Sequence, residues 1–190
     1  MYRSDHVMAG LGAIFAVVAM GIDMNDLSPR AWGAEAATKP AAKERGGGMA
    51  GAMEAIRALA GTWAGVAPAK EGEKPMTITF KATAMGTAVM ETMFPGSDHE
   101  MVNMYTGDGD TVLVTHYCAL GNQPRMKLVS ADDGVLKFVF LDSANLKSRD
   151  EMHMDSLELT IKGDRLTEKW ESYQDGKVTS TESFEFKRQG

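Results

Sequence analysis

Cysteine is nearly absent from this sequence. Cys118 is the only one among 190 residues, so the chain cannot form an internal disulfide. Lys and Arg number 20 against 26 Asp and Glu, so the clustered positive surface that binds nucleic acid is not indicated. The chain also lacks a Gly-rich phosphate loop, a Ser-His-Asp array and an HExxH signature. Hydrolase and nucleotide-binding functions are therefore unsupported.

A long apolar run is missing as well. The apolar stretch at residues 7–22 is shorter than the roughly 20 residues of a membrane-spanning helix, and it follows a single cation, Arg3. Those features are typical of an export signal, and the small-x-small site at 34–36 is a candidate cleavage point. We predict an export signal over 1–36 and a periplasmic or extracellular product. An uncleaved N-terminal anchor is the alternative, and membrane contact is expected only in that case.

The rest of the chain is organised by two periodicities. Residues 37–48 end in three glycines and are predicted to be a flexible linker. Met53 and Ile56 lie on one face of a predicted short helix over 49–59, which Gly61 can terminate. Beyond Gly61, apolar and polar residues alternate, as in half-buried strands. The predicted strands are 62–66, 76–84, 87–94, 100–106, 111–120, 125–130, 135–141, 152–162, 165–173 and 178–187.

Short turns join these strands, and Asp-Gly pairs at 133–134 and 175–176 suit tight hairpins. A long antiparallel meander leaves two exposed edges, which closure into a barrel removes. We therefore predict an all-β domain over 49–190: a closed antiparallel up-and-down barrel of about 8–10 strands with a short N-terminal helix. A sandwich is the second choice. A barrel of this size is either filled by side chains or holds a small ligand.

Gly61 and Trp63 form a Gly-x-Trp motif after the predicted helix. In this respect the chain resembles the calycins, which include lipocalins, fatty-acid-binding proteins and nitrobindin-like barrels, and most of all uncharacterised exported bacterial lipocalin-like proteins. The resemblance implies that Trp63 plugs one barrel end beneath a cation from the last strand, either Lys187 or Arg188. Nitrobindin-like barrels bind haem through a late-strand histidine, but the last histidine here is His153, ahead of the final two strands.

The fragment His116-Tyr117-Cys118 raises the possibility of a site. Residues i and i+2 of a strand face the same side, so His116 and Cys118 project together. They are either polar anchors in a cavity or a hydrogen-bonded core histidine beside a small buried thiol. A zinc site would need a further ligand from His99 or His153, and their spacing does not require one. No metal is predicted.

Charged residues on apolar faces are better indicators of a binding site. Glu168 shares a face with Trp170, and Glu182 shares one with aromatic residues of the last strand. If these faces point inward, the carboxylates need partners, because an unpaired buried charge is prohibitive. Arg125 and His116 are the candidates. The resulting inward cluster would hold a ligand's polar head or stabilise the fold, whereas outward-facing glutamates would simply be solvated.

Methionine is unusually frequent, with 15 residues. The methionines of the predicted barrel either fill its core, line a pocket for an apolar ligand, or bind copper(I). The copper interpretation is weakened at residues 152–154, because strand alternation directs Met152 and Met154 away from His153.

These patterns favour a non-enzymatic exported barrel that binds a small, mainly apolar or amphipathic molecule with a polar head, without a cofactor. The predicted ligand-binding residues are His116, Cys118, Arg125, Glu168, Trp170 and Glu182. Two alternatives remain. One is a solid-cored interaction module of the cell envelope with an exposed patch around Met93, Phe94, Met101 and Met104. The other is a haem-binding or enzymatic barrel that uses His116.

Overall fold

A computed structural model describes residues 49–67 and 75–190; the predicted export signal and linker lie outside these ranges. The predicted all-β fold is confirmed: ten antiparallel strands close into an up-and-down barrel in the order β1-β10-β9-β8-β7-β6-β5-β4-β3-β2. The elements are α1 (Met49–Arg57), β1 (Gly61–Gly65), β2 (Thr77–Thr83), the short 3-10 helix η1 (Ala84–Gly86), β3 (Ala88–Met93), β4 (Met101–Asp108), β5 (Thr111–Tyr117), β6 (Gln123–Asp132), β7 (Val135–Ala144), β8 (His153–Lys162), β9 (Arg165–Gln174) and β10 (Lys177–Arg188).

Within these described ranges, no helix combines the length and the apolar character that crossing a membrane would require.

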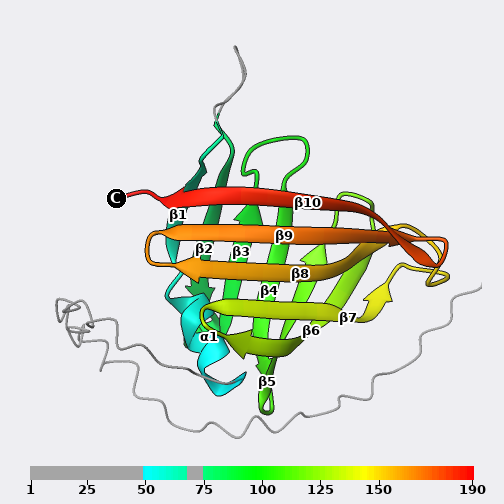
Figure 1. The fold of residues 1–190 in the computed structure, drawn as a ribbon, viewed down its shortest axis with the longest axis horizontal. Coiled ribbons are helices and arrows are strands. Elements are labelled where there is room, and N and C mark those ends of the chain that lie inside the picture. The colour runs from blue at the N-terminus through cyan, green and yellow to red at the C-terminus, as the bar shows by residue number, and fades with distance from the viewer. Residues whose placement is uncertain (1–48, 68–74) are drawn as a thin grey trace, which may run out of the picture. The chain divides into compact units, whose positions relative to one another are not determined.

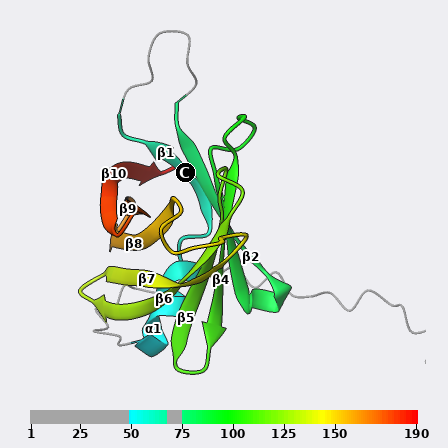
Figure 2. The same ribbon diagram turned by 90° about the vertical axis from the view of Figure 1, so that its right-hand side faces the viewer.

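Successive strands run in opposite directions, so the connections between them alternate between the two ends of the barrel. The helix end carries α1 and the turns around 84–87, 109–110, 133–134 and 163–164. The loop end carries the connections 94–100, 118–122, 145–152 and 175–176. Figure 1 shows β8, β9 and β10 crossing β3, β4 and β5 at a steep angle, and Figure 2 shows α1 beside the strands at the helix end.

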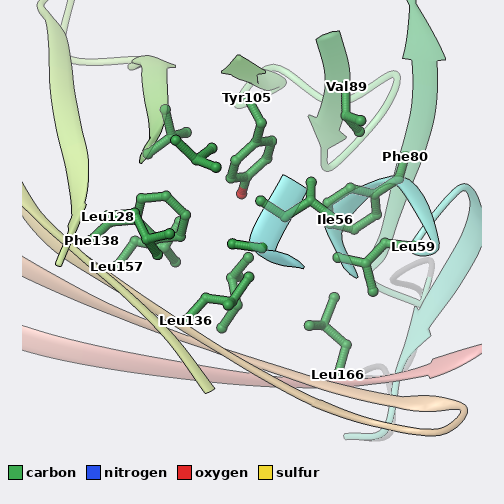
Figure 3. Packing of buried hydrophobic residues seen from close by; sticks show 14 of the residues in the cluster. Ile56, Leu59, Phe80, Val89, Tyr105, Leu128, Leu136, Phe138, Leu157 and Leu166 are labelled. Carbon is green, nitrogen blue, oxygen red and sulfur yellow. The ribbon is translucent and has the colours of Figure 1, made fainter. Parts of the chain in front are cut away.

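The core at the helix end is filled by side chains. Ile56 of α1 and Leu59 after it are at most 1% exposed, and Figure 3 shows both pointing between the strands toward Phe80. Leu136 and Phe138 of β7 are buried whereas the residues between and after them are exposed, as strand alternation requires. Each large apolar side chain buried in this way stabilises the fold by about 1.5–3 kcal/mol.

Trp63 closes the helix end under a cation. Its ring is fully buried and its Nε1 donates to the carbonyl oxygen of Leu59 at 2.8 Å. The Arg188 guanidinium lies 4.3 Å from the ring centroid and donates to two carbonyls after α1, including that of Ala60 at 2.7 Å. The covering cation suggested by the calycin resemblance is therefore Arg188, while Lys187 is exposed.

Two irregularities modify the predicted strands at the loop end. β5 ends at Tyr117 rather than at 120, because the Cys118 amide turns to bond Asn122 O and the Gly121 amide bonds Cys118 O. β7 and β8 pair only from Val135 opposite Thr160 to Val139 opposite Ser156, and beyond this point the ladder is not continued.

Candidate functional site

Three neighbouring strands direct polar side chains into the barrel. Glu91 of β3 lies opposite Asn103 of β4, and Asn103 lies opposite His116 of β5. Strand alternation places all three on the inner face, where each is at most 1% exposed. Buried polar groups of this kind require hydrogen-bond partners.

Directional hydrogen bonds connect these three side chains. Asn103 Nδ2 donates to Glu91 Oε2 at 2.8 Å, so Asn103 Oδ1 is the acceptor in its 2.6 Å contact with His116 Nδ1. His116 therefore carries its proton on Nδ1. Tyr105 OH also donates to Glu91 Oε2, at 2.7 Å, and Figure 3 shows the Tyr105 hydroxyl directed into the interior.

β9 supplies the other side of the cluster. Trp170 Nε1 donates to Glu168 Oε2 at 3.2 Å, and the Trp170 ring centroid lies 4.9 Å from that of His116. The carboxyl group of Glu168 is hydrogen-bonded to that of Glu91. Contacts thus run in a closed circuit through Glu91, Asn103, His116, Trp170 and Glu168, which we call the polar ring. Its members are at most 4% exposed.

Two buried carboxyl groups beside each other repel strongly when both are ionised, so we infer that Glu91 and Glu168 share a proton. Burial raises the pKa of Glu168 well above its usual value, and the negative charge of Glu91 and the hydrogen bond between them raise it further. Burial also raises the pKa of Glu91, but hydrogen bonds from Asn103, Tyr105 and Glu168 partly offset this. These opposite effects place the proton on Glu168, which donates to Glu91.

His116 is neutral and one of its nitrogens is unused. Burial lowers the pKa of His116 to about 4, so the ring is uncharged at neutral pH. Because Nδ1 holds the proton, Nε2 presents a lone pair, and this buried atom has no hydrogen-bond partner. Leaving a buried polar atom unpaired costs about 1–3 kcal/mol.

The polar ring is poor in donors. Its unpaired buried atoms are Glu91 Oε1, Glu168 Oε1 and His116 Nε2. A shared proton gives the two carboxyl oxygens a partner, but His116 Nε2 still lacks one. Every Lys and Arg between 51 and 67 or 75 and 190 is exposed or half-buried, so none is enclosed with these atoms. The ring lacks both a free donor for His116 Nε2 and a positive charge.

Half-buried apolar side chains from β4, β8, β10 and the connection after β3 pack against the core. Phe184 of β10 lies opposite Glu168, and its ring makes an edge contact with Phe94 at 6.0 Å between centroids. Met101 and Met154 are also half-buried against the core. We call these four residues the apolar cover. Phe94 has a φ of +54°, a left-handed conformation that bulky residues rarely adopt and that stores strain.

Three of the predicted ligand-binding residues, His116, Glu168 and Trp170, meet in the polar ring. Cys118 is buried, at 9% exposed, in the turn after β5, and burial raises the pKa of its thiol. Whether these residues bind a ligand stays a prediction.

The expectation that Arg125 and Glu182 join this cluster is wrong. Arg125 lies between the buried Pro124 and Met126, so it faces outward, where its Nε donates to Asp142 Oδ1 at 2.6 Å. Glu182 lies opposite Trp170 but is exposed. The register of β1 on β10 covers only residues 186–188, so β1 does not shield this part of β10.

Sequence reasoning missed Glu91, Asn103 and Tyr105. Glu91 stands between Val89 and Met93 on the inner face of β3, so a charge on an apolar face was its available signal. Asn103 and Tyr105 carried the same signal less clearly, because an amide and a phenol are common on strands.

The other two histidines that the structure describes lie elsewhere. His99 is exposed in the connection after β3. His153 is fully buried and packs against Phe140 and Tyr173, with the Arg149 guanidinium 3.8 Å from the Tyr173 ring. Across the described part of the chain, no three His, Cys, Asp or Glu side chains converge in a way that could hold a metal ion.

A separate pocket of about 210 Å³ involves β8, β9 and β10, and none of its lining residues belongs to the polar ring. It is lined by Thr160, Lys162, Arg165, Leu166, Thr167, Glu185 and Phe186.

No protein-family model matches the chain, and no curated protein matches it. The closed ten-stranded antiparallel barrel is consistent with a calycin-like fold.

Proposed function

We propose that this protein is a non-enzymatic binding protein for a small amphipathic molecule. The molecule's polar head hydrogen-bonds to the polar ring, and its apolar part contacts the apolar cover. The observation that carries this proposal is the buried acceptor His116 Nε2, which has no donor, beside two carboxyl groups that have only one proton between them. Native proteins leave few such atoms unpaired, and a binding site is one reason to retain them.

The proposed ligand enters by displacing side chains rather than by filling an open hollow. The ring residues are almost inaccessible, so the cover must move before a head group reaches them. Phe94 and Phe184 are only half-buried, and the positive φ of Phe94 means that its backbone is held in an unfavourable conformation. Release of that strain on opening would favour ligand entry.

We also propose that the barrel acts after export, in the periplasm or outside the cell, as the apolar run at 7–22 suggests. Cell fractionation with N-terminal sequencing of the mature protein tests this point separately from ligand binding.

Native mass spectrometry and organic extraction of the full-length protein test the binding proposal. We expect a small molecule to co-purify, and we expect His116→Phe to lose it while His99→Phe retains it. The first variant keeps an aromatic ring but removes the unpaired acceptor, whereas the second changes an exposed histidine. Equal recovery from both variants, or no guest from the unaltered protein, contradicts the proposal.

A solid-cored interaction module is the second candidate, and the near-zero exposure of the inner side chains favours it. The patch expected for that function is not exposed: Met93 is 2% exposed, and Phe94, Met101 and Met104 are half-buried. Cross-linking that captures one protein partner on the outer barrel surface, without any guest, would favour this candidate.

A further inference from the structure

We propose that the polar ring selects a primary ammonium, so that the ligand is a small amphipathic amine. This inference rests on the proposed binding function and specifies its chemistry. A primary ammonium offers three N–H donors and one positive charge. The ring contains one acceptor without any partner, His116 Nε2, and two carboxyl oxygens that have only their shared proton, with no enclosed Lys or Arg among the described residues.

The directions of the hydrogen bonds determine that the missing partner is a donor. Asn103 donates to Glu91 and accepts from His116, which leaves only a lone pair on His116 Nε2. The carboxyl oxygens of Glu91 and Glu168 both become acceptors once their shared proton leaves. A head group that only accepts, such as a carboxylate, would leave His116 Nε2 unpaired and add a repulsive charge.

The charge of the head group determines whether the polar ring prefers an ammonium or a neutral donor. The donors that reach Glu91 within the barrel, from Asn103 and Tyr105, are uncharged. An ammonium can take the place of the proton that the pair shares, because it brings the same single positive charge and forms short, charge-assisted hydrogen bonds to both carboxylates. A hydroxyl or a buried water can donate to one or two of these atoms, but it carries no charge that could replace the shared proton.

Binding of an ammonium should change the protonation of the glutamate pair. The cation replaces the proton that Glu168 holds, and this proton passes to the buffer. One proton should therefore be released for each amine bound near neutral pH. This readout uses the unaltered protein and does not depend on the folding of any variant.

Calorimetric titration of the full-length protein tests the inference with four probes of one chain length: octylamine, octyltrimethylammonium, octanol and octanoate. We expect octylamine to bind most tightly, because octyltrimethylammonium carries charge without N–H donors and octanol carries a donor without charge. Titration in buffers of different ionisation enthalpy should show release of about one proton for octylamine alone, which is the proton of the Glu91–Glu168 pair.

Matched variants locate the effect. Glu168→Gln and Glu91→Gln should each weaken octylamine binding roughly 10- to 100-fold, as expected for a lost charge-assisted hydrogen bond. Glu182→Gln, at an exposed carboxylate on the same face, should bind octylamine like the unaltered protein.

The outcomes separate the two proposals. Octanol, octanoate or the quaternary ion binding as tightly as octylamine, or octylamine binding without proton release, overturns the ammonium assignment but preserves the binding function. Binding of none of the four probes overturns the ammonium assignment; if no guest co-purifies either, the binding function fails with it. Equal binding by Glu168→Gln and Glu182→Gln overturns the location.

Discussion

The carboxyl groups of Glu91 in β3 and Glu168 in β9 are hydrogen-bonded inside the barrel, although their strands are not neighbours in the sheet. Only closure of the sheet brings them together. One proton between them relieves a repulsion that two buried carboxylates would otherwise suffer. This pair sets both the pH dependence of the fold and the chemistry of the proposed site.

Glu168→Gln should remove a loss of stability at high pH. The pKa of Glu168 is raised in the folded protein. Its contribution to the free energy of unfolding is therefore complete below its ordinary pKa of 4.5, and it is lost as the pH rises toward the pKa of the folded state. Glutamine keeps an N–H donor toward Glu91 without the ionisable group. We expect the variant to match the unaltered protein near about pH 5 and to be the more stable near about pH 9 in urea unfolding. Glu182→Gln, the exposed control, should show no such divergence.

His116→Gln should improve stability in acid. The folded pKa of His116 is about 4 and the ordinary value is 6.5, so the folded state resists protonation in that interval. The contribution of His116 to the free energy of unfolding is therefore complete above about pH 6.5. It falls as the pH drops toward 4, by about 3 kcal/mol in total. Unfolding curves between these pH values should show this loss reduced in His116→Gln and unchanged in His99→Gln. Parallel losses in the two variants would contradict the assignment.

Tyr105→Phe should destabilise the fold by about 1–3 kcal/mol, because Glu91 loses a buried donor while the ring volume is nearly kept. Tyr117→Phe is the matched control: this tyrosine is 51% exposed on the adjacent strand and should change stability little. Chemical unfolding at neutral pH measures both. A smaller effect in Tyr105→Phe than in Tyr117→Phe would show that the phenol is not needed by Glu91.

Arg188→Met should weaken the closure of the helix end. The substitution removes two hydrogen bonds to carbonyls after α1 and the cation over Trp63, with an expected loss of about 1–3 kcal/mol. Lys187→Met changes the neighbouring exposed cation and should have little effect on stability. Trp63 emission should shift to longer wavelength in the first variant alone, since only there does the ring gain access to water.

The sequence allowed the barrel to be predicted because alternation is a local property. Leu136 and Phe138 show it directly, and the same reasoning identified Glu168 beside Trp170. Arg125 could also have been assigned correctly, since Met126 and Leu128 share the inner face while Arg125 and Lys127 share the outer one.

Pairing across the barrel was beyond such local reasoning. Glu91 and Glu168 are far apart in sequence, and their meeting depends on strand number and on the register of every intervening pair. The exposure of Glu182 was likewise beyond local reasoning. This residue lies opposite the buried Trp170, but its exposure depends on where β1 ends against β10.

The most direct test of the account is carbon-13 NMR of the glutamate side-chain carboxyls in the full-length protein near neutral pH. We expect one glutamate to be protonated, its signal to be missing in Glu168→Gln, and its signal to persist in Glu182→Gln. If every glutamate carboxyl is ionised under these conditions, the shared proton does not exist and the polar ring is not arranged as described.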